Sequence, residues 1–219
     1  MGTYKVNVEA VKKSDNQASS IYRSGLYNIV IQKVYITTRK QGSKQLNIRY
    51  RLEGSNKDNG TLFISMTNNN GSDNFQKVLF DKLITVLDLT EISTEKQTIK
   101  TKKDSFEATC FPALENKKVK VWVKFRYNKF KDNIYESIDV QEFFRISDNA
   151  VAKEVLTKEN IGKRFEACKV ATNVTDYRDG LTKEDVDAWL EKRKNESMSG
   201  KKESAVITPE VDIDDEIPF

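Results

Sequence analysis

Hydrophobic and polar residues alternate with a period of two along much of the chain. The clearest run is Lys117–Lys131, where valine and phenylalanine occupy one side while lysine, tryptophan and arginine occupy the other. Such alternation is typical of a β-strand with one buried face. Runs rich in β-branched and aromatic residues predict further strands at Leu26–Thr38, Leu46–Leu52, Thr61–Met66 and Ile134–Ile146. The pattern therefore predicts a mainly β protein.

Two stretches have the spacing of helices instead. The first follows a capping-box-like start at Asp73 and carries a regular apolar stripe, Phe75, Val78, Leu79, Leu83, Val86 and Leu87. We expect this helix to fill the core. The second is Thr182–Lys194, where Thr182 and Asp185 form a capping box ahead of a short apolar stripe. Residues 150–180 are mixed in character and predict only short helical turns.

The order of three strands, a helix and two strands predicts a five-stranded barrel like the oligonucleotide-binding (OB) fold, with one core helix. The same order also fits other small antiparallel barrels. We expect a lead-in segment at residues 1–24, the barrel at 25–149, a C-terminal helical extension at 150–197 and a disordered acidic tail at 198–219. The lysine-rich insertion Thr90–Ser105 is either a mobile flap or a solvated loop.

Composition narrows the possible chemistry. The 219 residues are 37% hydrophobic and 32% charged, which describes a soluble protein with a core. There is no histidine and there are only two cysteines, so histidine-dependent catalysis, zinc sites and a disulfide scaffold are excluded. No glycine-rich phosphate loop is present either. We therefore expect no enzymatic activity, no cofactor and no metal.

The chain also lacks the apolar run that a secretory signal or a membrane span requires. We expect no membrane association and a cytoplasmic location, which would be the host cytoplasm if the protein is phage-encoded.

The net charge of +4 is distributed unevenly. Residues 201–219 hold two lysines and six acidic residues, a net charge of −4, which leaves 35 basic and 27 acidic residues, or +8, for the remainder. A basic body with an acidic tail is typical of a domain that binds a polyanion and carries an interaction arm.

The polar side of the predicted strands has the composition of a single-stranded nucleic-acid site. Cations neutralise phosphates and flat rings stack on bases. The candidate phosphate contacts are Arg49, Arg51, Lys118, Lys120, Lys124 and Arg126. The candidate stacking rings are Trp122, Tyr127, Phe130 and Tyr135. A solvated strand whose lysines prevent edge-to-edge aggregation is the structural alternative.

The last eight residues carry the most specific motif in the chain. An acidic cluster precedes a C-terminal Ile-Pro-Phe, in the order Asp212, Ile213, Asp214, Asp215, Glu216, Ile217, Pro218 and Phe219. This motif resembles the acidic tip of bacterial and phage single-stranded DNA-binding proteins. The body, roughly residues 25–146, resembles the phage-encoded members more loosely, through Glu115–Lys124 and the later Glu142–Arg145. Glu216 stands where aspartate is common in the tip and preserves the charge.

The resemblance implies a protein that binds single-stranded DNA without strong sequence preference during replication, recombination or repair. It also implies that Asp212, Asp214, Asp215, Glu216, Ile217, Pro218 and Phe219 recruit replication or recombination proteins. A terminal phenylalanine offers a ring and a carboxylate to one pocket, while the acids meet a basic rim. Assembly into a homo-oligomer is a further expectation.

Three alternatives remain open from the sequence. An RNA-binding module on the same barrel would use the same cations and rings. A Mg²⁺-dependent nuclease would need carboxylates, for which Asp139 and Glu142 are the candidates. A recruitment factor would use its basic body to bind an acidic protein.

Overall fold

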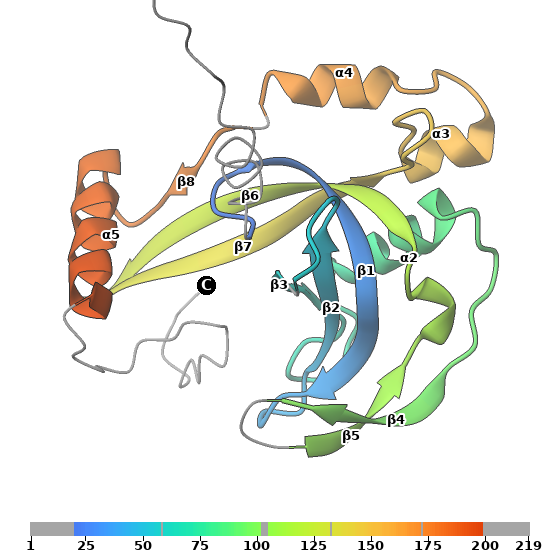
Figure 1. The fold of residues 1–219 in the computed structure, drawn as a ribbon, viewed down its shortest axis with the longest axis horizontal. Coiled ribbons are helices and arrows are strands. Elements are labelled where there is room, and N and C mark those ends of the chain that lie inside the picture. Colours follow the sequence, from blue (N-terminus) through green and yellow to red (C-terminus); the bar gives the residue numbers. More distant parts are fainter. Residues whose placement is uncertain (1–19, 58, 102–104, 132, 172, 199–219) are drawn as a thin grey trace, which may run out of the picture.

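A computed structural model describes residues 20–57, 59–101, 105–131, 133–171 and 173–198. Its eight strands are β1 (Gly25–Thr38), β2 (Lys44–Leu52), β3 (Gly60–Ser65), β4 (Glu95–Lys100), β5 (Ser105–Cys110), β6 (Lys118–Phe130), β7 (Asn133–Phe144) and β8 (Asp176–Tyr177). Its helices are α2 (Lys77–Val86), α3 (Ala152–Thr157), α4 (Lys163–Lys169), α5 (Lys183–Met198) and a 3-10 turn, η1 (Pro112–Leu114). The protein is mainly β, as predicted (Figure 1).

The sheet is organised around β1. One edge of β1 pairs with β2 from Ile29 to Thr38, across a bulge between Ile31 and Lys33. The other edge pairs first with β6 and then with β5. Outside β1, β2 pairs with β3, β4 with β5, and β6 with β7. These pairings are antiparallel, whereas the short β8 lies parallel to β6.

The main core lies between the inner face of this curved sheet and α2. Inward residues alternate along every central strand, including Ile29, Ile31, Val34, Leu46, Ile48, Leu62, Ile64, Val119, Val121 and Val123. From α2, Leu79, Phe80, Leu83 and Val86 complete it. Burial of a large apolar side chain contributes about 1.5–3 kcal/mol to folding, so the predicted role of α2 as the core helix is confirmed.

The sequence analysis placed the beginning of this helix and of its apolar stripe too early in the chain. The helix begins at Lys77, so Phe75 precedes it, and 83% of Phe75 is exposed. Val78 lies on the helix but is 52% exposed. Asp73 caps nothing; its carboxylate pairs with Lys77 at 2.8 Å, while the Asn74 side-chain oxygen accepts from the Gln76 amide. The apolar stripe is therefore shorter than the sequence pattern indicated.

The five predicted strands correspond to β1, β2, β3, β6 and β7, and α2 lies between the third and fourth of them as predicted. Among the described residues no pairing joins β3 to β7, so the sheet is open at that point. The described part of the insertion after α2 contains a strand that the sequence analysis did not predict. Residues 95–100 form β4, which pairs with β5, and Ile99 and Ala108 are buried against Tyr35 and Cys110.

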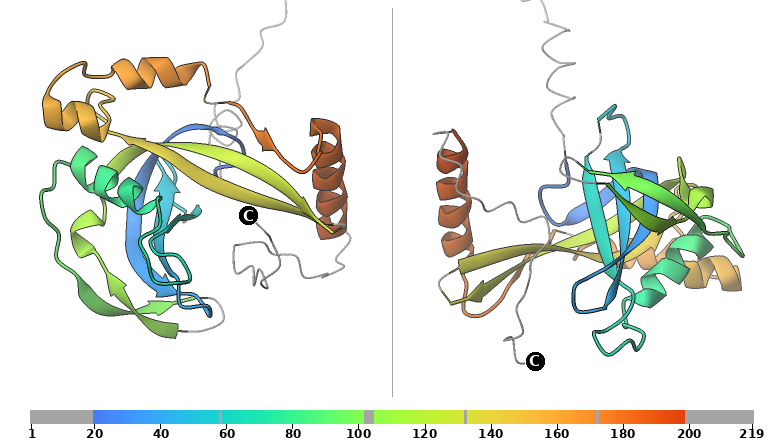
Figure 2. Two further views of the ribbon diagram at one scale, coloured as in Figure 1. Left: turned by 180° about the vertical axis from the view of Figure 1, so that it is seen from behind. Right: turned by 90° about the horizontal axis from the view of Figure 1, so that it is seen from below.

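The hairpin of β6 and β7 extends beyond the rest of the sheet as an arm, and α5 lies at its far end (Figures 1 and 2). The predicted capping box is present, with the Asp185 amide donating to Thr182 Oγ1 at 3.2 Å and the Thr182 amide donating to Asp185 Oδ2 at 2.9 Å. From α5, Val186 is buried in the main core and Trp189 packs against it. The helix therefore docks on the arm.

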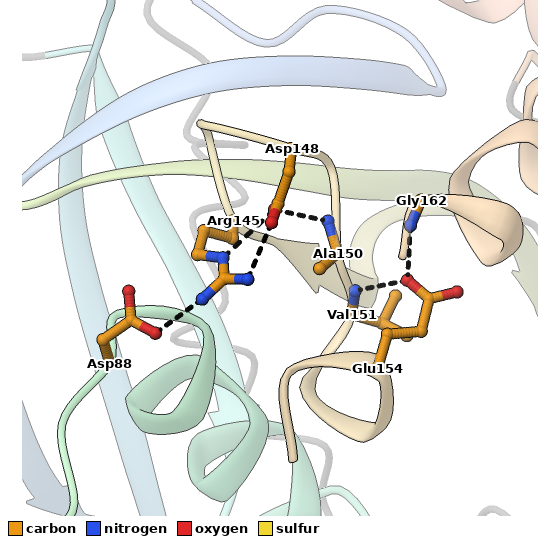
Figure 3. Close-up of polar contacts among 7 residues, drawn as sticks. All are labelled: Asp88, Arg145, Asp148, Ala150, Val151, Glu154 and Gly162. Carbon is orange, nitrogen blue, oxygen red and sulfur yellow. Dashed lines mark hydrogen bonds and ion pairs between the residues drawn. The ribbon is translucent and has the colours of Figure 1, made fainter. Parts of the chain in front are cut away.

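Residues 145–169 follow β7 and include α3 and α4. Two sets of polar contacts, made by Arg145 and by Glu154, hold this segment in place (Figure 3). The guanidinium of Arg145 binds Asp88 at 2.7 Å and Asp148 at 2.7 and 3.1 Å. The buried carboxylate of Glu154 accepts the backbone amides of Val151, Gly162 and Arg164 at 3.1, 3.0 and 2.8 Å. These bonds fix α3 to α4 and both to the end of β7.

We expect Asp148→Asn to lower the free energy of unfolding at pH 7. Hydrogen bonds from Arg145 hold the pKa of Asp148 below its ordinary value of 3.8, although partial burial opposes them. The carboxylate therefore contributes its full stabilisation above that value and loses it as the pH falls through the folded-state pKa. Urea unfolding is measured from pH 7 down to about pH 2. The difference in unfolding free energy between wild type and variant should become smaller as the pH falls.

A suitable control is Asp187→Asn, because Asp187 lies exposed on α5 and pairs only at 3.9 Å with Lys183. A gap between wild type and Asp148→Asn that stays constant across this pH range would contradict the expectation.

Candidate nucleic-acid interface

The strand registers bring the two predicted basic stripes onto one side of the sheet. On β2, Arg49 and Arg51 alternate with the core residues Ile48 and Tyr50 and so point away from the core. Val30 of β1 pairs with Arg51 on one side and with Lys118 of β6 on the other. Directly paired residues share a face, so Arg51 and Lys118 flank Val30. We call this side of the sheet the outer face.

The outer face continues along the β6–β7 arm. Every second residue of β6 from Lys118 lies on it, including Lys120, Trp122, Lys124, Arg126 and Phe130. Tyr135 of β7 pairs with Asn128 and therefore lies there too. Of the ten predicted site residues, all but Tyr127 share this face.

Tyr127 points to the opposite side and is only 5% exposed. Its ring stacks with Tyr177 at a centroid distance of 6.0 Å and meets the edge of Trp189 at 6.2 Å. Its hydroxyl donates to Glu136 at 2.8 Å, and burial and then that carboxylate raise the pKa of Tyr127. The prediction of Tyr127 as a base-stacking ring is therefore wrong for this conformation, because its position in the alternation makes it a core residue that anchors α5.

Trp122 and Lys120 lie on the outer face but are covered by α4. Trp122 packs against a small cluster that includes Phe144, Phe165 and Cys168. The ammonium of Lys120 lies 4.4 Å from the centre of the Phe165 ring and hydrogen-bonds Asn149. Burial and then Lys169 lower the pKa of Lys120. Neither residue is presented openly to a ligand in this structure.

Arg126 takes part in an ion-pair network instead of standing alone. It binds Asp139 of β7 and also Asp176 of β8, the latter at 3.3 Å. Arg178 contacts the same Asp176 carboxylate at 3.1 Å. Burial raises the pKa of Asp139 while Arg126 opposes the shift. Arg126 therefore ties β8 to the arm, and Lys124, which pairs with Asp139 in the strand register, borders the same network.

Of the six candidate phosphate contacts Lys118 alone is exposed, and the other five are half-buried. Lys118 is exposed and binds Glu53 at 2.8 Å, and hydrogen bonds from Lys118 and then Asn28 lower the pKa of that carboxylate. Arg51 donates to the Ser55 carbonyl at 2.9 Å. An exposed ion pair such as Lys118–Glu53 contributes only about 0–1 kcal/mol, so a phosphate can replace Glu53 at low cost.

One aromatic residue of the outer face was missed by the sequence analysis. Phe63 of β3 pairs with Asn47 and is half-buried on this face, between the inward residues Leu62 and Ile64. Its indication in the sequence was an aromatic side chain at a position where the alternation calls for a polar one. Lys33 of β1, expected on the basic outer face of the first hairpin, pairs with Arg49 and lies 3.6 Å from Glu115. It reaches this face because a bulge before it reverses the alternation of β1.

The two carboxylates considered for a nuclease point to different partners. Asp139 pairs with Arg126, and Glu142 binds Lys82 of α2 at 2.7 Å. Within the described residues no group of three or more acidic or cysteine side chains is arranged to hold a metal ion. The residues of the acidic tip, Asp212, Asp214, Asp215, Glu216, Ile217, Pro218 and Phe219, lie outside the described part of the chain.

Comparison with protein-family models gives no match, and comparison with curated proteins gives no match either. No helix in the described part of the chain is long and apolar enough to cross a membrane. The functional argument therefore depends on the arrangement of the side chains.

We expect Trp122→Ala to destabilise the protein by roughly 0.5–3 kcal/mol, the common range for single substitutions, because the half-buried indole packs between β6 and α4. Chemical unfolding monitored by circular dichroism measures the loss. Phe165→Ala is the matched control, since Phe165 packs in the same cluster from α4. Equal effects of both variants on single-strand affinity would assign Trp122 a structural role. A loss of affinity with Trp122→Ala alone would assign the indole to the binding surface.

Proposed function

We propose that this protein is a single-stranded DNA-binding protein without enzymatic activity. It binds DNA with little sequence preference in replication, recombination or repair, and its acidic tip recruits partner proteins. The observation that carries the proposal is the outer face, where Arg49 and Arg51 of β2 and Lys118 of β6 lie on the two sides of β1, with Phe63 on β3 beside β2.

The strand connections support an OB-like barrel as the scaffold. In the OB fold, five strands and one helix build a partly open barrel, and the face of its second and third strands binds oligonucleotides. Here β1, β2, β3, β6 and β7 take the five strand positions, with α2 before the fourth, and β4 and β5 form an inserted hairpin. On this assignment β2 and β3 supply the binding face, which contains Arg49, Arg51 and Phe63.

The chemistry of this face suits a single strand better than a duplex. Unpaired bases expose flat surfaces that stack on an aromatic ring, whereas bases within a duplex are already stacked. Phe63 supplies such a ring, and Phe130 and Tyr135 supply two more toward the tip of the arm. Cations beside these rings contact the phosphates and bind in a way that does not depend on sequence.

Fluorescence titration tests the proposal. The full-length protein is titrated with poly-dT, poly-U and duplex DNA at two salt concentrations. We expect salt-sensitive binding to poly-dT and weaker binding to both competitors. Preference for poly-U would make the protein an RNA-binding module, because the 2′-hydroxyl distinguishes the two polymers. No binding to any of the three would reject the nucleic-acid proposal.

In the same assay we expect Arg49→Ala and Lys118→Ala each to lower the slope of log affinity against log salt by about 0.7, the value for one phosphate contact on a single strand. The matched control is Lys192→Ala, because Lys192 lies exposed on α5 away from the outer face. Slopes that change equally in all three variants would show a general charge effect and not a defined site.

We expect deletion of Asp212–Phe219 to have two separate effects. It removes four acidic residues, so single-strand binding should tighten modestly at low salt as competition for the basic face is relieved. It should also abolish recruitment of partner proteins, measured by capture of replication and recombination proteins on DNA-bound protein. A matched variant, Phe219→Ala, keeps the four acids and should lose recruitment only. No change in either property would remove the tip from the proposal.

A further inference from the structure

Phe75 is the most exposed large aromatic residue in the described part of the chain, at 83%. It lies at the end of the connection between β3 and α2, residues 66–76, which we call the β3–α2 loop. Burial of Phe75 therefore contributes little to the stability of the fold. Its neighbour Val78 is itself exposed and does not cover the ring. The outer face does not include it, so its exposure has no explanation in the site described above.

The β3–α2 loop that carries Phe75 is cross-linked by its own side chains. Asn68 donates to Ser72 Oγ at 2.9 Å, and the Asn74 amide group donates to Asn68 Oδ1 at 2.8 Å. On the other side of Phe75, the Gln76 side-chain oxygen accepts the Ser65 amide at 3.0 Å. Gly71 supplies the left-handed turn, with φ of 81°. A loop fixed in this way has little freedom to lose on binding, so contacts made by Phe75 incur a small entropic cost.

The β3–α2 loop lies directly against the turn between β1 and β2, residues 39–43. Asn69 donates to the side chain of Gln41 at 2.8 Å, and the Lys44 amide donates to Thr67 Oγ1 at 2.8 Å. In Figure 1 the two segments meet at the lower end of the sheet. Phe75 is therefore held on the same end of the molecule as the β1–β2 turn.

The β1–β2 turn is cationic. Arg39, Lys40 and Lys44 are exposed on or beside the β1–β2 turn. No acidic residue occurs between Ile31 and Leu52. The acid nearest to Phe75 in the loop is Asp73, and its charge is matched by Lys77 at 2.8 Å. A polyanion approaching Phe75 therefore meets positive charge without a compensating carboxylate on the β1–β2 turn.

We propose that Phe75 and the β1–β2 turn form a second contact site for single-stranded nucleic acid, separate from the outer face. Phe75 stacks on an exposed base, while Arg39 and Lys44 contact the adjacent phosphates. The inference rests on the proposed function and extends it. It identifies where a nucleic-acid strand that is longer than the outer face continues beyond that face. The cations favour a nucleic acid over a protein as the occupant, because a protein contact of this size would need a wider apolar patch than one ring and Val78.

The site should engage only strands long enough to reach it. Affinities are measured by fluorescence anisotropy for dT oligomers from about 6 to about 20 nucleotides, the scale on which one OB-type domain covers a strand. Full-length wild type is compared with Phe75→Ala, Phe75→Trp and the matched control Val78→Ala, which truncates the neighbouring exposed residue. Thermal unfolding verifies that all four proteins remain folded, as the exposure of both residues leads us to expect.

We expect Phe75→Ala to weaken binding of the longer oligomers by about 5- to 30-fold, the lower part of the range for one base stacked on an aromatic side chain. The shortest oligomers should bind as they do to wild type. Phe75→Trp should keep the affinity and show stronger fluorescence quenching with long oligomers than wild type does. Val78→Ala should match wild type throughout.

Four results would overturn the inference. If wild type binds the oligomers and Phe75→Ala binds every length equally well, the second site is absent while the proposed function stands. If Phe75→Ala weakens the shortest and longest oligomers alike, Phe75 belongs to the principal site. If the variant alters only self-association, measured by sedimentation, Phe75 contacts a second copy of the chain. If wild type binds no oligomer, the proposed function and this inference fail together.

Discussion

The fold depends on how the two backbone edges of β1 are shared. One edge is occupied by β2, while the other is divided, with β6 on Gly25–Val30 and β5 on Tyr35 and Ile36. Between these two partners the chain stays bonded to β1, because the Ile31 carbonyl accepts the Asn116 amide and the Val34 carbonyl accepts the Phe111 amide. The bulge between Ile31 and Lys33 bends the strand where its partner changes. The arm and the β4–β5 hairpin leave the sheet in different directions for this reason.

The sequence predicted the elements whose burial follows a simple period. Alternation along β6 identified Val119, Val121, Val123 and Phe125 as core residues, and each is buried. The rule failed where the partner of a strand decides its burial. β4 is lysine-rich and gives no apolar alternation, yet Ile99 is buried because β5 and Tyr35 lie beside it. Pairing between distant segments is not encoded in local pattern, so the hairpin could not be anticipated.

For the candidate site, too, local alternation predicted some positions correctly and could not predict contacts between distant segments. The alternation placed Arg49, Lys118 and Lys124 on the side away from the core, and the register brought their strands together. It also assigned Trp122 to that side, but could not reveal that α4 lies over it. Tyr127 belonged to the inward alternation from the start, so its misassignment came from counting aromatic residues near lysines without applying the period to them. Phe75 was misplaced for the opposite reason, because helical spacing continued past the true beginning of the helix.

The ion pairs of the outer face decide which of its cations can exchange a carboxylate partner for a phosphate. A cation that already contacts a carboxylate, as Lys118 contacts Glu53 and Arg126 contacts Asp139, must give up that ion pair to bind a phosphate. When a phosphate replaces the carboxylate, the displaced acid must be rehydrated. The exposed Lys118 pair can make this exchange readily, whereas the half-buried Arg126 network cannot, because β8 would lose its anchor. Under the proposed function, Lys118 is therefore the cation that exchanges its partner most readily, whereas Arg126 serves chiefly to hold β8.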